Sequence, residues 1–348
     1  MKGRPLIGLK PNTIRKLITL GLVIAIALLF GLTTESFFTV RNLTMVFRDA
    51  SYVGVIALGV SFVVIGGGID LSANGIVCFA GMVCARLGVL AGFPAPAIVA
   101  VGIACGALCG YINGMCVTRL HLSEFITTLA SGYVFGGFAV FLVFREHGIV
   151  TSTAVTNKAF LALGKTVPHT YVYIFSIVWV ALAIAVYLIQ TRTRFGLHTV
   201  AVGSNYRSTL MSGVDVDFIK VMGFVLAGAF CGIAGVFQVA YQSASTLTLG
   251  DTMGFQAVAV CVVGGIVLGG GKGDALGAFL GALFMVMLLN GLYKISPSPA
   301  IQFMFQGLIL LVAIFFDSWF NRIMEQRLLL EARPLRGAKR AAAEGGDA

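Results

Sequence analysis

Long apolar runs dominate the chain and are separated by short polar or glycine-rich segments. A helix that crosses a membrane needs about 20 apolar residues, and breaking the 348 residues at polar, Gly and Pro positions gives about ten such runs. Charged residues make up only 11% of the chain, less than half of the share of about 25% found in soluble domains. The sequence therefore predicts an all-α membrane protein of about ten transmembrane helices.

Two of these spans, the second and the eighth, are short and end in glycine runs. The first follows a basic stretch, as a signal peptide does, but no small-residue cleavage site follows it, so we expect an uncleaved anchor. The ten predicted spans are Leu17–Thr33, Ser51–Ile65, Gly75–Leu90, Ala97–Val117, Phe125–Phe144, Tyr171–Gln190, Val221–Tyr241, Gly254–Leu268, Ala275–Tyr293 and Ala300–Phe320.

The basic residues predict the orientation of these spans. Cytoplasmic loops carry an excess of Lys and Arg, and 17 of the 24 basic residues fall on the side of the N-terminus when the spans alternate. Both termini are therefore expected in the cytoplasm. The predicted parts are a cytoplasmic N-terminal segment (1–16), a transmembrane domain (17–320) and a basic cytoplasmic tail (321–348). The net charge of +10 is explained by this topology, and we expect no nucleic-acid partner.

Two glycine-rich breaks interrupt the apolar pattern, and each is followed by an aspartate. Gly66, Gly67 and Gly68 precede Asp70, and Gly269, Gly270 and Gly271 precede Asp274. Interrupted helices in corresponding places of two halves point to a transport path, although this similarity between the two hairpins is weak. We interpret both breaks as gate elements.

Asp70 and Ser72 allow two compatible interpretations. A charge at the bilayer centre is costly, so Asp70 should face protein, water or the membrane interface. In the first interpretation Asp70, Ser72 and Asn74 cap the third helix by accepting its free N–H groups. In the second, the glycine break and this helix start form part of the gate.

A ridge of glycines occurs in the fourth span. Gly102, Gly106, Gly110 and Gly114 repeat every four residues, which places them on one helix face. Such a strip lets another membrane helix approach closely, so these residues are predicted to serve helix packing rather than substrate contact.

The sequence carries no sign of catalysis, metal binding or nucleotide binding. The run Gly269–Gly273 lacks the order of a phosphate-binding loop, since Gly273 rather than Ser or Thr follows Lys272. There is no Ser/His/Asp set and no pair of carboxylates, and the four histidines lie apart. We expect no enzyme activity, no metal and no cofactor on this chain.

Residues 191–220 form the most informative loop. Ser204 or Asn205 can begin a short helix there and Gly213 can end it. Apolar side chains exposed on a cytoplasmic helix suit a docking surface. The residues of this predicted coupling helix are Ser204, Asn205, Tyr206, Arg207, Leu210, Met211, Ser212 and Gly213.

From about residue 17 to 320, the chain resembles the permeases of sugar ABC importers, such as the ribose and methyl-galactoside types. The matching motifs are Gly67-Gly68-Ile69-Asp70-Leu71-Ser72, Thr193-Arg194-Phe195-Gly196, Gly203-Ser204-Asn205 with Ser212-Gly213-Val214, and the glycine-rich run from Val263 to Gly277. Departures occur at Ala73-Asn74-Gly75, at Arg207-Ser208-Thr209 and at Gly254-Phe255-Gln256. They leave the solute undefined.

The resemblance implies a ten-helix ABC importer permease fold in a bacterial inner membrane, paired with a second permease subunit. It also implies a periplasmic binding protein that delivers a sugar or polyol, and a cytoplasmic ABC ATPase that binds ATP and Mg²⁺ and accepts the coupling helix. Three alternatives stay open: a nucleoside permease, a branched-chain amino acid permease, and an ion-coupled secondary transporter. The last would need acids inside the spans, which are almost absent.

Overall fold

A computed structural model describes most of the chain: residues 11–90, 93–145, 148–149, 152–295, 298, 300–308, 311–312, 315 and 319. Most of the predicted N-terminal segment and the whole basic tail 321–348 lie outside these described residues.

The described part is mainly helical, with four short strands. Its helices are α1 (Pro11–Thr33), α2 (Val40–Ile65), α3 (Ala73–Val89), α4 (Ala95–Arg119), α5 (Glu124–Val143), α6 (Lys158–Leu161), the 3₁₀ turn η1 (Ala162–Gly164), α7 (Ile174–Arg192), α8 (Arg194–Ser204), α9 (Tyr206–Met211), α10 (Val216–Gln242), α11 (Met253–Val263) and α12 (Ala275–Ile295). Its strands are β1 (Phe144–Arg145), β2 (Gly148–Ile149), β3 (Ser152–Ala154) and β4 (Ala244–Thr246); β1 pairs with β2 and β3 with β4, both antiparallel.

Seven of the described helices are long and apolar enough to cross a membrane: α1, α2, α4, α5, α7, α10 and α12. The third and eighth predicted spans correspond to the shorter apolar helices α3 and α11. The tenth, Ala300–Phe320, falls partly outside the described residues, although 300–308 are helical. The chain is therefore a multi-pass membrane protein.

The predicted start of the second span is wrong. Helix α2 begins at Val40, not at Ser51, and is 26 residues long. Its first turns contain polar residues whose hydrogen bonds hold the helix together: Thr39 Oγ1 accepts from the Asn42 backbone N–H at 3.3 Å, and Asn42 Nδ2 donates to the Phe37 carbonyl at 2.9 Å. Hydropathy alone assigned this polar stretch to a loop.

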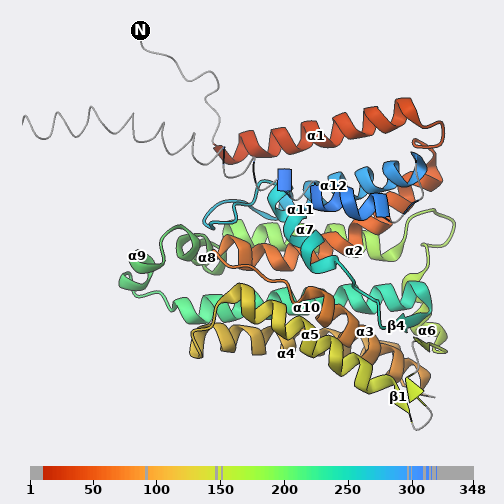
Figure 1. The fold of residues 1–348 in the computed structure, drawn as a ribbon, viewed down its shortest axis with the longest axis horizontal. Helices are drawn as coiled ribbons and strands as arrows, with labels where there is room; N and C mark the ends of the chain where they lie inside the picture. Colours follow the sequence, from red (N-terminus) through yellow and green to blue (C-terminus); the bar gives the residue numbers. More distant parts are fainter. Residues whose placement is uncertain are drawn as a thin grey trace, which may run out of the picture.

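The long helices run between two ends of the molecule (Figure 1). Helices α8 and α9 lie at one end, called here the α9 end. Strands β1 and β4 and helix α6 lie at the other, called the β4 end.

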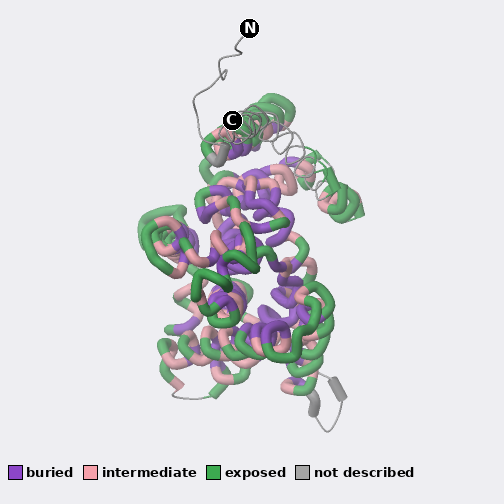
Figure 2. Tube along the Cα trace, turned by 90° about the vertical axis from the view of Figure 1, so that its left-hand side faces the viewer, coloured by how far each residue is buried: buried purple, intermediate pink, exposed green. Residues whose placement is uncertain are grey.

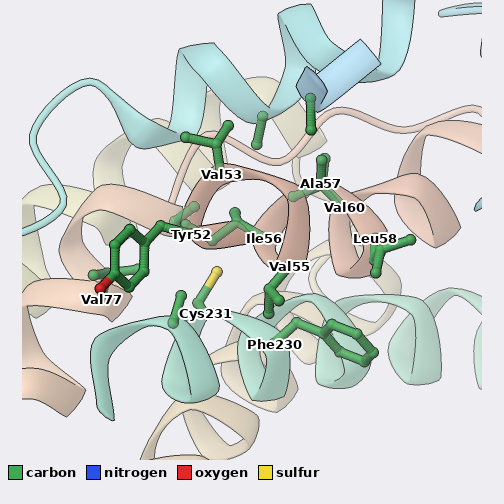
Figure 3. Close-up of a cluster of buried hydrophobic side chains, with 14 of the residues drawn as sticks. Tyr52, Val53, Val55, Ile56, Ala57, Leu58, Val60, Val77, Phe230 and Cys231 are labelled. Carbon is green, nitrogen blue, oxygen red and sulfur yellow. The ribbon is translucent and has the colours of Figure 1, made fainter. Parts of the chain in front are cut away.

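Helix α2 occupies the centre of the bundle. In its most apolar stretch 89% of the residues are buried, against 11% in α1. Figure 3 shows its side chains Tyr52, Val55 and Ile56 beside Phe230 and Cys231 of α10. The tube in Figure 2 is purple in the middle of the molecule and green along peripheral helices. Apolar helices that stay exposed in this way suit a lipid environment.

The glycine ridge of α4 lies against α10. A methyl group at Gly106 would collide with the Gly228 carbonyl oxygen, and one at Gly110 with the Phe224 carbonyl oxygen. At Gly114 it would lie 2.9 Å from the Cα of Val221. At the other end of the ridge, Gly102 packs against side chains of α3 and α10. The two backbones can meet this closely only because no side chains separate them.

Candidate transport site at the glycine junction

Three glycine-containing segments meet near the α9 end: Gly66–Gly68, Gly203–Ser204 and Gly269–Gly271. We call this contact the glycine junction. The Gly271 backbone N–H donates to the Ile65 carbonyl at 2.8 Å. Gly270 has a φ of +80°, and a methyl group there would lie 2.7 Å from the Cα of Gly67 and 2.9 Å from the Cα of Gly203. The two predicted gate segments are thus in direct contact, and both touch the residues that precede α9.

The second glycine break is also held by the start of α1. Arg15 Nη1 donates to the Gly265 carbonyl at 3.2 Å, and Lys16 forms an ion pair with Asp274. Asp274 Oδ1 in turn accepts from the backbone N–H groups of Leu276 at 3.1 Å and Gly277 at 3.3 Å. Asp274 therefore stabilises the N-terminus of α12, where a negative charge is favourable.

The residues that follow the first glycine break return to the interior of the helical bundle. After Gly68 the chain is not helical until α3 begins at Ala73. A methyl group at Gly254, in the first turn of α11, would lie 2.9 Å from the Leu71 carbonyl oxygen. The two short helices α3 and α11 therefore begin near each other. Short, interrupted helices of this kind form substrate paths in transporters.

Asp70 is completely buried beside this helix start. Its Oδ1 accepts from the Ser72 backbone N–H at 2.9 Å and from the Ser72 hydroxyl at 2.6 Å. Asn113 Nδ2 donates to the Ser72 hydroxyl oxygen at 2.8 Å, which ties the break to α4. Burial raises the pKa of the Asp70 carboxyl, and the two hydrogen bonds from Ser72 only partly oppose this shift.

The predicted capping arrangement is wrong for Ser72 and Asn74. Ser72 is the N-cap of α3, but its backbone is already in the right-handed helical region and its side chain makes no cap hydrogen bond. The hydroxyl donates to Asp70 instead. Asn74 Oδ1 is buried and has no hydrogen-bond partner within the described residues. Asp70 accepts the backbone N–H of Ser72, the N-cap residue itself, rather than a free N–H group of α3, and Thr128 Oγ1 accepts that of Leu71 at 3.1 Å.

The predicted coupling helix corresponds to α9. Asn205 Oδ1 accepts from the Ser208 backbone N–H at 3.0 Å, so Asn205 is the N-cap. Ser204 instead ends the preceding helix α8, and most of the predicted loop 191–220 is helical. Gly213 follows the helix with a φ of +79°.

The surface of α9 is open. Tyr206, Arg207, Leu210, Met211 and Ser212 are all exposed, and Met211 reaches 88% exposure. A short helix with exposed apolar side chains is suited to contact another protein. Its docking role remains a prediction.

A chain of side-chain contacts joins α9 to the first glycine break. Lys220 Nζ lies 5.7 Å from the ring centre of Tyr206 and donates to Glu124 Oε1 at 2.6 Å. Glu124 Oε2 fills the space beside Gly68, where a methyl group would collide with it. A recess of about 380 Å³ opens next to this ion pair, lined in part by His121 and Asp217.

Sequence reasoning missed α8 and the pairing of Glu124 with Lys220. Two signals could have indicated the pair: Glu124 is an acid at the start of an apolar span, and Lys220 is a base at the start of another. Ionisable groups in such places tend to pair. The described residues contain no group of three or more His, Cys, Asp or Glu side chains that could hold a metal.

A bundle of membrane-length helices with two glycine breaks and an exposed helix joined to both defines a membrane transport permease. The comparison with known proteins gives the family: the chain belongs to the one described as branched-chain amino acid transport system / permease component, which matches residues 42–314.

Curated relatives in this family are named as sugar permeases. The ribose import permease protein of Bacillus subtilis is 33% identical over 86% of this chain and 91% of its own length. The D-allose transport system permease protein of Escherichia coli is 32% identical over 85% of this chain and 89% of its own. The fructose import permease protein of Rhizobium meliloti is 28% identical over 82% of this chain and 80% of its own length. No solved structure matches the chain.

Proposed function

We propose that this protein is the membrane-spanning permease of a binding-protein-dependent ABC importer that moves a sugar or polyol into the cell. The observation that carries this proposal is the glycine junction, because a single exposed helix, α9, is continuous with residues that touch both breaks in the helical bundle. A force applied to α9 from outside the bundle would act on both breaks together.

The family supports a proposal for the full assembly. We propose ten membrane helices per subunit, both termini in the cytoplasm and a second permease subunit beside this one, in a bacterial inner membrane. A periplasmic binding protein delivers the solute, and a cytoplasmic ATPase binds ATP and Mg²⁺. The permease hydrolyses nothing itself.

The proposed mechanism is alternating access driven by the ATPase. When its nucleotide-binding subunits close on ATP, α9 moves with the groove that holds it. Gly203 and Ser204 then shift against Gly67, Gly270 and Gly271, and the helices on either side of each break change their angle. This is a coupling free energy between two sites, carried by an element with two positions.

The sugar assignment rests on the relatives rather than on the family description. The description names branched-chain amino acids, whereas the relatives with high coverage are named for ribose, allose, fructose and xylose. A sugar is therefore the leading class of solute, and a branched-chain amino acid or a nucleoside is the alternative.

Reconstitution tests the proposal. The permease is placed in liposomes with its ATPase and binding protein, and uptake of labelled sugars is measured with ATP, without ATP, and under an ion gradient alone. We expect uptake only with ATP and the binding protein. Uptake by the permease alone under an ion gradient would show a secondary transporter instead.

Leu210→Asp extends the test to α9. Leu210 is 52% exposed, so an aspartate there costs the fold little but disrupts an apolar contact with a partner. We expect loss of ATPase co-purification while the permease still inserts into the membrane. Arg192→Gln, at the exposed end of α7, is the matched control.

A further inference from the structure

A second cluster of polar and aromatic side chains lies far from α9. Arg48, Asp49 and Tyr52 come from α2, Tyr173 precedes α7 and Tyr241 comes from the last turn of α10. We call these five residues the tyrosine–arginine cluster. It lies at the β4 end, where α10 leads into β4 (Figure 1). Neither the glycine junction nor α9 takes part in it.

Arg48 is fixed at the centre of this cluster. Its Nε and Nη2 reach Asp49 Oδ1 at 2.8 and 2.7 Å, and its Nη1 donates to the Tyr241 hydroxyl. The guanidinium carbon lies 4.4 Å from the ring centre of Tyr241 and 5.2 Å from that of Tyr173. These contacts engage all three guanidinium nitrogens and place two aromatic rings beside the cation, so Arg48 holds its neighbours in place.

Two neighbours of Arg48, Asp49 and Tyr241, have surfaces that remain available to a ligand. Both Arg48 hydrogen bonds to Asp49 end on Oδ1, and no contact within the described residues reaches Oδ2, although 44% of the Asp49 side chain is exposed. Tyr241 is 39% exposed.

These free groups have the chemistry that a sugar requires. An open carboxylate oxygen accepts hydrogen bonds, and a sugar offers several hydroxyl donors. The C–H faces of a sugar ring can pack on an exposed tyrosine ring, because aromatic side chains combine an apolar face with a polar edge.

We propose that the tyrosine–arginine cluster is a contact site for the sugar as it enters the permease, with Asp49 Oδ2 accepting hydroxyls and Tyr241 providing a stacking face. The proposal rests on the proposed function, in which the α9 end faces the ATPase and the β4 end therefore faces the incoming solute. It assigns selectivity among sugars to the permease as well as to the binding protein.

The test compares conservative variants in the reconstituted complex. Asp49→Asn keeps the Arg48 contact at Oδ1 and removes the charge, Tyr241→Phe keeps the ring and removes the hydroxyl, and Tyr173→Leu removes a ring. Matched controls are Glu35→Gln and Tyr171→Phe. Both residues are exposed and lie outside the cluster. Glu35 belongs to the segment that joins α1 to α2, which lies at the β4 end (Figure 1), and Tyr171 is two residues from Tyr173 in the segment before α7. The probes are D-ribose, D-xylose, D-allose and D-fructose, at rising concentrations of loaded binding protein.

For Asp49→Asn we expect a maximal uptake rate about tenfold lower, which corresponds to the free energy of one hydrogen bond to a charged group. The concentration of binding protein that gives half-maximal uptake should not change. Tyr241→Phe and Tyr173→Leu should change the relative rates of the four sugars. Thermal stability and the amount of assembled complex should match the controls.

Two outcomes would overturn the proposal. One is uptake that equals the controls for all four sugars. The other is an equal rise in half-saturating binding protein for every sugar, which would show a protein-docking surface. If the wild-type complex moves none of the sugars, the proposed function fails, and saturation-transfer NMR of the same sugars with the isolated permease in nanodiscs still tests the cluster alone. If a variant does not assemble with its partners, sugar binding by the isolated variant and the isolated wild-type permease is compared by the same NMR measurement, and equal binding would overturn the proposal.

Discussion

Asp70 is an acid enclosed entirely by protein, and no ion pair within the described structure reaches it. A buried carboxylate without a cation favours its protonated form, which agrees with the raised pKa of Asp70. We therefore expect Asp70 to act by accepting two hydrogen bonds from Ser72 rather than by providing charge, and the variants below test this. The sequence correctly indicated a special position at Asp70, because an acid is rare beside an apolar span. It could not indicate that Asn113 on α4 donates to the Ser72 hydroxyl oxygen, since Asn113 is distant in sequence.

Substitutions of Asp70 separate these two roles. Asp70→Asn keeps an oxygen acceptor for Ser72 and should preserve both assembly and transport. Asp70→Leu leaves a buried backbone N–H and a hydroxyl without their acceptor and should cost about 1–3 kcal/mol of stability for each group. Thermal unfolding of the purified permease in detergent measures both changes.

The pH dependence provides a check on the same variants. A carboxyl with a pKa raised by folding binds its proton more tightly in the native state, so wild-type stability should fall as pH rises through the raised pKa, above the ordinary aspartate value of about 3.9. Asp70→Asn should lose this component of the slope. An Asn variant as unstable as the Leu variant would contradict the neutral-acceptor role.

At the scale of elements, the positions of the helices were largely predictable and their contacts were not. Nine predicted spans correspond to described helices, because a long apolar run has few alternatives to a membrane helix. The first eleven residues of α2 were missed, since Arg48 and Asp49 interrupt the apolar pattern that hydropathy depends on. Strand β3 pairs with β4 across about ninety residues of sequence, which no local pattern could reveal.

The glycine junction was predicted only in part. The two breaks and the helix α9 were each visible as local motifs. Their meeting depends on how α2, α8 and the segment before α12 pack, which is tertiary information. Even so, the positive φ of Gly67, Gly270 and Gly271 explains why glycine is required at these three positions.

Two neighbouring glycines offer a matched test of the junction. At Gly270, an alanine would face the backbone of Gly67 and Gly203 and adopt a left-handed φ, a strain of roughly 1–2 kcal/mol before any clash. At Gly269, the nearest atom to an added methyl group is Val267 Cγ1 at 3.9 Å, an ordinary contact. Gly270→Ala should therefore abolish ATP-driven uptake, and Gly269→Ala should retain it. Equal uptake by the two variants, at equal amounts in the membrane, would remove the junction from the mechanism.

The whole molecule has two ends with different chemistry. At the α9 end, an exposed helix is connected to both breaks. At the β4 end, an ionic and aromatic cluster retains free acceptors. The positive-inside rule predicts that the α9 end faces the cytoplasm, because 17 of the 24 basic residues fall on that side of the predicted topology. The proposed import mechanism requires the α9 end to face the cytoplasm and the β4 end to face the outside.

Cysteine labelling of spheroplasts, whose inner membrane is still intact, measures the orientation directly. Met211→Cys places a thiol on α9, where the side chain is 88% exposed. Glu35→Cys places one on the exposed segment that joins α1 to α2, at the opposite end of the molecule (Figure 1). The unsubstituted chain gives the baseline, since five of its seven cysteines are buried and Cys105 and Cys116 are partly exposed. A membrane-impermeant maleimide should label only Glu35→Cys from outside, and Met211→Cys only after the membrane is opened. Because a cytoplasmic ATPase can move α9 only if α9 is cytoplasmic, labelling of Met211→Cys from outside would refute the importer mechanism as well as the orientation.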